Sequence, residues 1–344
     1  MTEPRALKAA LAPYRQALAT ASPEGLDAAL SVIAPGAEVR LGHPWGEGTG
    51  PGHLKAALGD LLAAMPDLER RDMIVVGGTT PEGADWVGCM GQFMGTFLAP
   101  LLGIPPTGHL AHMRYHEFFR VEDGRVVEVQ ALWDLPEVMM QAGVWPMAPQ
   151  LGRFLATPAP MTGDGLTAGG DGSAALQRVQ AMLTDLCRHP ADPDPAVMRL
   201  GDHWHPRFNW YGPCGVGTAR GIAGFRHWHQ IPFLRAFPDR KLDAMGGLMS
   251  HWIAEGAYVA ETGWPNMRLT LAGDGLMGLA PTGREVTLKS LDFWRVEGDL
   301  IRENWVLFDV LDLFAQAGVD VLARMREVTK ARVAHPVTLP EPLA

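Results

Sequence analysis

The segment "PTGHLAHMRYHEFFRVEDGRVVEVQALWDLPEVMMQAGV" (residues 106–144) recurs further along the chain as "PTGREVTLKSLDFWRVEGDLIRENWVLFDVLDLFAQAGV" (281–319). The two segments align without a gap at a shift of 175, and 14 of the 39 positions are identical. Upstream, "MPD" (65–67) matches "FPD" (237–239) at a shift of 172, and "PWGEGT" (44–49) matches "PCGVGT" (213–218) at a shift of 169. Loop insertions produce such small steps in the shift. The sequence therefore predicts a duplicated domain.

The length of the chain and the segment between the repeats set the expected domain boundaries. A chain of 344 residues is long enough for two domains of about 150 residues. Between the repeats, Pro and Gly dominate and no periodic pattern persists, which is typical of a linker. We therefore expect domain 1 at 1–146, a Pro/Gly-rich linker at 147–173, domain 2 at 174–330 and a C-terminal tail at 331–344.

Each repeat is predicted to begin with helices and to end with strands. Asp123-Gly124 is a type I′ hairpin signal that makes the last two strands neighbours. Helices followed by an antiparallel sheet indicate the α+β class. Apolar spacing predicts helices over 4–19, 26–33 and 52–67 in the first repeat, and over 174–188, 195–204 and 224–239 in the second. In the first repeat, strand-like runs follow at 69–78, 84–95, 109–121 and 125–134, with a short helix at 135–144.

Composition argues against several classes of partner. The formal charge is −9, and Lys and Arg are scattered, so no basic face is expected for nucleic acid. No apolar run approaches the ~20 residues that span a bilayer, and the N-terminus lacks the apolar core of a signal peptide, so no membrane partner is expected. Three widely separated cysteines favour the cytoplasm. The "HWH" triplets at 203–205 and 227–229 lack zinc-like ligand spacing, so we expect no metal and no cofactor.

The order of the motifs points to a known family. "GTGPGHLKAALGDLLAAMPDL" (48–68), "GIPPTGH" (103–109), a hairpin with "DGR" and a closing "QAGV" resemble the SnoaL-like polyketide cyclases, which have the nuclear transport factor 2-like (cystatin-like) fold. The resemblance implies two tandem α+β cone domains, each a curved antiparallel sheet wrapped by helices around a blind apolar pocket. Members of this fold commonly dimerise through the outer face of the sheet. The resemblance thus implies an intramolecular pseudo-dimer, and it leaves a further homo-oligomer open.

The resemblance also implies a function. Family members close a ring by an intramolecular aldol step without a cofactor, acting on a polyketide-like carbonyl compound, and related lyase or isomerase steps use the same acid/base chemistry. Their proposed acid/base Asp lies ten residues before the closing Gln. In this chain those positions are Ala131 and Val306, which cannot transfer a proton. The alternative is therefore a non-catalytic module that binds a small molecule and has lost the family's acid/base residue.

Other acidic residues persist in both repeats and supply the candidate catalytic groups. If the turn at 123–124 has two residues, cross-strand partners sum to 247, which places Glu117 opposite Gln130. A carboxyl group on an apolar wall would have its pKa raised into the range of a general base. Strand alternation then predicts that Tyr115, Glu117, Glu128, Gln130 and Asp134 share one face, as do Ser290, Asp292, Glu303, Trp305 and Asp309.

From these faces we predict two sets of functional residues. The predicted catalytic carboxylates are Glu117, Asp292, Asp134 and Asp309. The predicted substrate-binding residues are Tyr115, Gln130, Ser290, Trp305 and Asn209, the last by its correspondence to a first-strand Asn of the family. Structural roles are the alternatives: solvated or ion-paired residues for Glu128 and Glu303, helix N-caps for Asp134 and Asp309, and buried hydrogen bonds for Glu117 and Asp292.

Overall fold

Two six-stranded sheets with the same strand order form the core of the protein. The computed structural model describes residues 3–189, 192, 194–240, 248–330 and 335–340. The first sheet has the order β2-β1-β6-β5-β4-β3, and the second has the equivalent order β8-β7-β12-β11-β10-β9. The strands are β1 (Ile33–Leu41), β2 (Glu47–Thr49), β3 (Glu69–Thr79), β4 (Asp85–Thr96), β5 (Leu110–Glu122), β6 (Arg125–Trp133), β7 (Trp204–Tyr211), β8 (Thr218–Arg220), β9 (His251–Glu255), β10 (Tyr258–Thr270), β11 (Glu285–Glu297) and β12 (Leu300–Phe308). The predicted duplication is confirmed.

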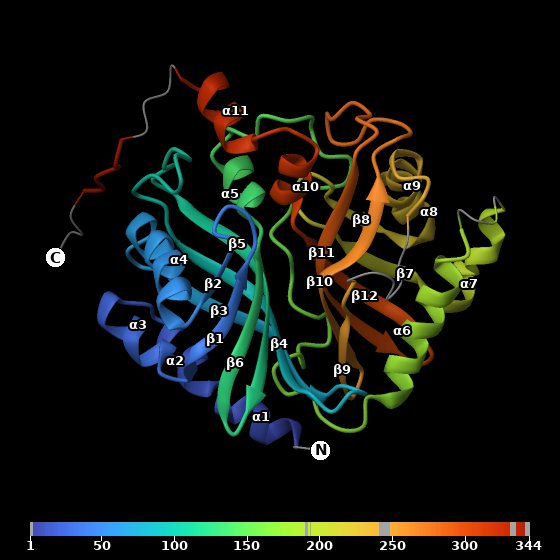
Figure 1. The fold of residues 1–344 in the computed structure, drawn as a ribbon, viewed down its shortest axis with the longest axis horizontal. Helices are drawn as coiled ribbons and strands as arrows, with labels where there is room; N and C mark the ends of the chain where they lie inside the picture. Colours follow the sequence, from blue (N-terminus) through green and yellow to red (C-terminus); the bar gives the residue numbers. More distant parts are fainter. Residues whose placement is uncertain (1–2, 190–191, 193, 241–247, 331–334, 341–344) are drawn as a thin grey trace.

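Helices cover the concave face of each sheet, which is turned away from the other sheet, as the α+β prediction requires (Figure 1). The first repeat contains α1 (Pro4–Ala10), α2 (Ala12–Leu18), α3 (Pro23–Leu30), α4 (Pro51–Ala64) and α5 (Leu135–Gln141). The second contains α6 (Ser173–Leu186), α7 (Leu200–His203), α8 (Gly221–Phe225), α9 (Ile231–Ala236), α10 (Val310–Gln316) and α11 (Val321–Val328), with a 3₁₀ turn at Pro195–Met198 and a π turn at Arg226–Gln230.

Two predicted helices are interrupted. The helix expected over 4–19 divides at Leu11, because Pro13 has no N–H to continue the hydrogen-bonded ladder. The helix expected over 195–204 breaks at Arg199, whose left-handed backbone (φ 46°) separates the 3₁₀ turn from α7. Trp204 then begins strand β7. The sheets also contain one parallel pair each, β1 with β6 and β7 with β12, beside the antiparallel pairs that the hairpins predicted.

The hairpin between β5 and β6 forms as predicted, but its register changes a few residues beyond the turn. Asp123 and Gly124 both have positive φ, as a type I′ turn requires, and Val121 pairs with Val126. Val127 is then an extra residue in β6, so that Arg120 pairs with Glu128 and Glu117 pairs with Ala131. The predicted pairing of Glu117 with Gln130 is therefore wrong, because a β-bulge shifts every later pair by one residue.

The two sheets pack against each other through their outer faces. Side chains from both repeats form one buried cluster between the sheets: Ile74, Val76, Trp86, Met90, Phe118, Leu132, Tyr211, Ile253, Tyr258, Ala260, Trp264, Leu291, Phe293, Trp305 and Leu307. Phe118 lies 5.2 Å from Phe293, ring centre to ring centre, and these two residues occupy equivalent positions in the repeats. The packing thus brings the same face of each sheet into one shared interface.

Buried polar contacts also join the repeats. The guanidinium group of Arg114 donates to the backbone oxygens of Tyr211 (2.9 Å), Gly212 (2.7 Å) and Val306 (3.1 Å). His116 is fully buried, and burial lowers its pKa well below the ordinary value, so the imidazole is neutral. Its Nδ1–H donates to the backbone oxygen of Leu291 at 2.5 Å.

The segment between the repeats follows the two sheets closely. The backbone N–H of Gly152 donates to Val216, and the backbone N–H of Val75 donates to Gly165. The indole N–H of Trp305 donates to Pro158 at 3.1 Å. The segment predicted as a linker therefore contacts both sheets along its length. In the predicted tail, 331–334 and 341–344 lie outside the described residues.

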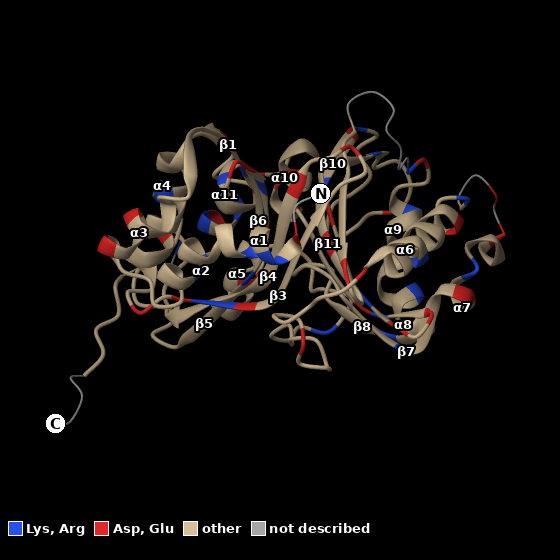
Figure 2. Ribbon diagram, turned by 90° about the horizontal axis from the view of Figure 1, so that it is seen from below, with Lys and Arg blue, Asp and Glu red and all other residues tan. Residues whose placement is uncertain are grey.

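Charged residues of both signs are interspersed over both repeats (Figure 2). Of the helices in the described part of the chain, none is long and apolar enough to cross a membrane.

Candidate functional site

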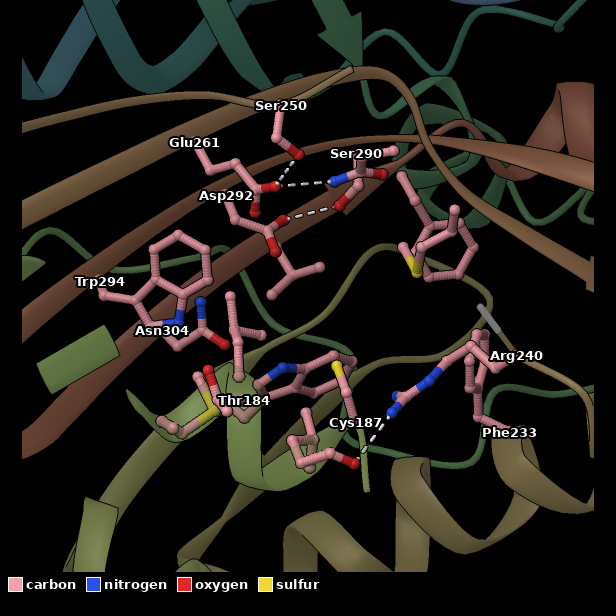
Figure 3. A pocket seen from close by; sticks show the side chains of 18 of the residues that line it. Thr184, Cys187, Phe233, Arg240, Ser250, Glu261, Ser290, Asp292, Trp294 and Asn304 are labelled. Carbon is pink, nitrogen blue, oxygen red and sulfur yellow. Dashed lines mark hydrogen bonds between the residues drawn. The ribbon is translucent and has the colours of Figure 1, made fainter. Parts of the chain in front are cut away.

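A cavity of about 560 Å³ lies in the second repeat, between the concave face of its sheet and the helices that cover it. That volume falls within the range of small-molecule sites in proteins. Most of its wall is apolar or aromatic, including Trp204, Trp210, Phe225, Phe233, Trp252, Trp294 and Phe308. The polar and charged lining residues are Thr184, Cys187, His229, Arg240, Ser250, Glu261, Asn266, Ser290, Asp292 and Asn304, most of which are labelled in Figure 3.

Two carboxyl groups lie side by side on the sheet wall of this cavity (Figure 3). Glu261 on β10 and Asp292 on β11 are directly paired residues of neighbouring strands, so their side chains project from the same face. Ser250 donates to Oε1 of Glu261 at 2.6 Å, and Ser290 donates to Oδ1 of Asp292 at 2.9 Å. Within the described ranges, neither carboxyl group has a Lys, Arg or His within ion-pair distance.

Burial decides the protonation of this pair. Removal from water raises the pKa of Glu261 to about 7, and the hydrogen bonds from Ser250 and Asn266 only partly offset this effect. Burial also raises the pKa of Asp292 well above its ordinary value, and the neighbouring Glu261 raises it further. Because two adjacent carboxylates repel each other, the pair titrates as a unit and retains a proton near neutral pH.

The first repeat has a carboxyl group, Glu117, at the position equivalent to Asp292, but this group forms an ion pair and several hydrogen bonds. Glu117 is fully buried and forms an ion pair with Nη1 of Arg70 at 2.6 Å. The indole N–H of Trp133 donates to Glu117 at 2.8 Å, and the hydroxyl of Tyr14 donates at 3.3 Å. The guanidinium of Arg70 also lies 4.1 Å from the ring centre of Tyr115. The expected pocket of the first repeat is therefore filled by side chains.

Residue sizes explain why one repeat is hollow and the other is filled. Tyr115 is fully buried, and its hydroxyl donates to Asp72 at 2.7 Å. The equivalent residue in the second repeat is Ser290, which leaves the volume of a phenol ring free. The shift of 172 aligns Arg70 with Leu242, which lies outside the described residues. The expectation of a pocket in each repeat is wrong for the first one, since its larger side chains occupy the space.

The β-bulge moves several predicted site residues to the opposite face of the sheets. Gln130 accepts a hydrogen bond from Thr262 of the other repeat at 2.5 Å, and Trp305 belongs to the cluster between the sheets. In the second repeat the extra residue is Arg302, so that Asp292 pairs with Val306 and Arg295 pairs with Glu303. The predicted common faces are therefore wrong. Tyr115 and Glu117 point into the interior of domain 1. Glu128 and Gln130 lie on the opposite face of the sheet, the one that faces the second repeat.

Glu128 and Glu303 form ion pairs on the outer faces of the two sheets. Arg40 and Arg120 contact the carboxylate of Glu128 at 2.8 and 3.1 Å, and Arg295 contacts that of Glu303 at 2.7 Å. This arrangement matches the ion-paired alternative rather than a position in a pocket.

Asp134 and Asp309 join the repeats reciprocally. The carboxylate of Asp309 accepts the backbone N–H of His43 at 2.8 Å, and that of Asp134 accepts the backbone N–H of Cys214 at 2.9 Å. Asp309 also caps α10 by accepting the N–H of Asp312. Burial raises the pKa of both carboxyl groups to about 6. Neither residue lines the cavity described above.

Asn209 and His203 do not line the cavity, whereas Trp204 and His229 of the two triplets do. The amide of Asn209 bonds to the hydroxyl of Tyr211 at 3.0 Å and to Arg220. His203 is buried beside Asp185, with Nε2 2.8 Å from the carboxylate. Over the described ranges, no group of three His, Cys, Asp or Glu side chains is arranged to hold a metal ion.

Comparison with known proteins identifies the family. The model of the SnoaL-like polyketide cyclase family matches residues 12–142 and 179–317, once in each repeat. The chain belongs to the SnoaL-like polyketide cyclase family. Among curated proteins, none matches it.

Several solved structures are similar to part of the chain. IdmH from Streptomyces antibioticus, described as a candidate polyketide cyclase, is 24% identical and covers 40% of this chain and 98% of its own, with a TM-score of 0.34. A candidate SnoaL-like polyketide cyclase from Jannaschia sp. CCS1 is 23% identical over 41% of this chain and 93% of its own, with a TM-score of 0.35. AclR from Streptomyces galilaeus, described as a candidate hydroxylase, is 18% identical over 40% of this chain and 95% of its own, with a TM-score of 0.34.

The repeat pattern of the sequence does not indicate two cavity residues of this SnoaL-like protein, Glu261 and Arg240. Glu261 stands in the apolar strand "YVAETGW" (258–264), where a single acid at an inward-facing position was the available signal. The counterpart of Glu261 at a shift of 172 is Cys89, so Glu261 is not among the acids that both repeats share. Arg240 follows the aligned "FPD" motif, where the first repeat has Leu68.

Proposed function

We propose that the second repeat is a cofactor-free acid/base catalyst that acts on a carbonyl compound bound in its cavity. Asp292 and Glu261 share one proton near neutral pH, so the ionised member of the pair is the general base and the protonated member is the hydrogen-bond donor. One observation carries this assignment: two carboxyl groups with raised pKa values adjoin on the wall of an apolar cavity. Perturbed carboxyl groups in a cavity are the usual signature of such catalysts.

The proposed step begins with a carbon that lies between two carbonyl groups. The ionised carboxylate of the Asp292–Glu261 pair removes its proton, and the electron pair of the broken C–H bond forms an enolate. The protonated member of the pair donates a hydrogen bond to the enolate oxygen. In an aldol closure, the enolate carbon then attacks another carbonyl carbon of the same molecule, and a C–C bond forms. The resulting alkoxide takes a proton from the pair, which returns to its starting state. A lyase or isomerase step would share the first proton transfer.

The position of Asp292 supports this proposal. The resemblance to characterised cyclases places their acid/base Asp at Val306 on β12. Asp292 is the direct cross-strand partner of Val306, so both side chains project from the concave face at the same height. A carboxyl group on the neighbouring strand would thus reach the same part of the pocket as the family's Asp.

The first repeat has a structural role in this proposal. Its carboxyl group at the equivalent position, Glu117, is neutralised by Arg70 and held by two further hydrogen bonds. We therefore assign Glu117 to stability rather than to proton transfer. The packed sheets support a pseudo-dimer in which the first repeat acts as the partner of the active one.

The test compares Asp292→Asn with the matched variant Glu117→Gln. Turnover of a panel of bicyclic β-keto esters is followed by the change in ultraviolet absorbance. We expect Asp292→Asn to lower kcat by about 10²-fold or more, the usual loss for a general base, while Glu117→Gln retains kcat. If wild-type protein converts a substrate and Asp292→Asn converts it equally fast, the assignment of the general base to this carboxyl pair is wrong.

A non-catalytic binding module is the second candidate function. It is favoured by the apolar residues Ala131 and Val306 at the two positions of the family's acid/base Asp. Wild-type protein that binds members of the β-keto ester panel by calorimetry but converts none of them would favour this function.

A further inference from the structure

The cavity of the second repeat contains a single arginine, placed apart from its carboxyl groups. Arg240 follows α9 and reaches the cavity from the side opposite Asp292 and Glu261 (Figure 3). It does not contribute to the pKa shift of either carboxyl group, which is consistent with this separation. His229 also lines the cavity, but burial lowers its pKa to about 3, so its imidazole is neutral. Arg240 is therefore the one cationic side chain among the described lining residues.

The hydrogen bonds of Arg240 leave most of its donors unused. Its Nη2–H donates to the backbone oxygen of Leu186, at the C-terminus of α6, at 3.1 Å. A guanidinium group has five N–H donors, and this contact uses one of them. The Nε–H is buried without a hydrogen-bond partner. In the described part of the chain, no carboxylate lies within ion-pair distance of Arg240.

A purely structural role does not explain the charge. Leu68, the counterpart of Arg240 in the first repeat, is 1% exposed. The fold therefore tolerates an apolar residue at this position. Arg240 is half-buried, and even partial burial of an arginine without an anionic partner has a desolvation cost, which lowers the pKa of Arg240 from its ordinary value. A bound anion would remove this cost.

Other lining residues also carry unused donors. The indole N–H groups of Trp204 and Trp294 are buried without hydrogen-bond partners. The cavity thus has flat aromatic walls, whose indole N–H groups are themselves buried.

We propose that Arg240 binds a carboxylate of the substrate, so that the cavity selects flat organic acids over their neutral analogues. This inference rests on the proposed function in taking the cavity as the substrate site, and it adds the chemical class of the substrate. The carboxylate pairs with the free edge of the guanidinium group, and the aromatic walls cover the rings. The reacting carbon then lies toward Asp292 and Glu261, away from the anchored end.

The test measures binding of 2-naphthoate and of 2-naphthamide by isothermal titration calorimetry. The two probes have nearly the same shape and differ in charge. A charge-assisted hydrogen-bonded pair predicts that wild-type protein binds the acid about tenfold more tightly than the amide. Arg240→Met should abolish this preference while retaining the affinity for the amide, and Arg240→Lys should restore part of it. The matched control is Arg235→Met, an exposed arginine on α9, which should behave as wild type.

Several outcomes would overturn the proposal. Equal affinities of wild-type protein for acid and amide would do so without any variant, as would the absence of acid binding. A preference for the acid that persists in Arg240→Met would also do so. Amide binding by Arg240→Met shows that the variant retains a folded cavity. Asp292→Asn should keep the preference for the acid, so a failure of the proposed catalysis remains distinguishable from a failure of this assignment.

Discussion

Replacement of Glu261 by Gln tests the electrostatic state of the cavity through its effect on stability. Burial raises the pKa of this carboxyl group from 4.5 to about 7. Folded protein therefore keeps a proton on Glu261 over a pH range in which the unfolded chain has lost it. Because one pKa unit corresponds to ~1.36 kcal/mol, the shift amounts to roughly 3 kcal/mol of stability that is lost at high pH.

The direction of the pKa shift of Glu261 determines how the free energy of unfolding changes with pH. A carboxyl group with a raised pKa in the folded state contributes stability that is fully present below pH 4.5 and is lost as the pH rises through 7. Gln cannot ionise. The free energy of unfolding of Glu261→Gln, minus that of wild type, should therefore rise by roughly 3 kcal/mol between about pH 4 and pH 8. Loss of the Glu261 charge also lowers the pKa of Asp292, which acts in the same direction.

Urea unfolding at a series of pH values measures this difference. Carboxyl groups elsewhere, including Asp67 and Asp72 with their lowered pKa values, are common to both proteins and cancel. Glu82→Gln, at an exposed loop position, is the matched control, because it makes the same substitution without removing a buried carboxyl group. A difference for Glu261→Gln that is flat or falls with pH would refute the reasoning, because Glu261 would then be ionised and compensated in the folded protein.

Three further changes test other parts of the structure. Arg114→Met removes the donors for three backbone oxygens of the second repeat, and urea unfolding should show a loss of about 3 kcal/mol or more. Ser290→Tyr, which copies Tyr115, should fill the cavity and abolish 2-naphthoate binding in calorimetry. Asp309→Asn should remove the loss of stability that accompanies ionisation as the pH rises from about 4 through 6, a contribution of roughly 3 kcal/mol measured by the same unfolding series.

Each of these expectations has a contradicting result. An Arg114→Met variant as stable as wild type would show that the interface does not depend on these bonds. Ligand binding by Ser290→Tyr at wild-type affinity would show that the ligand occupies another place. For Asp309, an unchanged pH dependence in the Asn variant would mean that the carboxyl group is ionised without cost in the folded protein.

Sequence alone determined the repeat, the order of helices and strands, and the turn at Asp123-Gly124. These features depend on local signals, namely residue identity at a fixed shift, apolar periodicity and a turn that requires positive φ. The sequence also pointed to Asp292, because an acid recurs there in both repeats. It did not determine which face later strand residues occupy, since one extra residue at Val127 or Arg302 leaves the alternating pattern almost unchanged.

Tertiary structure decided which repeat keeps a pocket and which charges share it. A cavity depends on the summed volumes of side chains from several strands and helices. The difference between Tyr115 and Ser290 therefore decides whether a cavity forms only once the surrounding residues are packed. Glu261 and Asp292 are 31 positions apart in the chain and become neighbours only through the pairing of β10 with β11. Their raised pKa values arise from burial, which is a property of the folded protein.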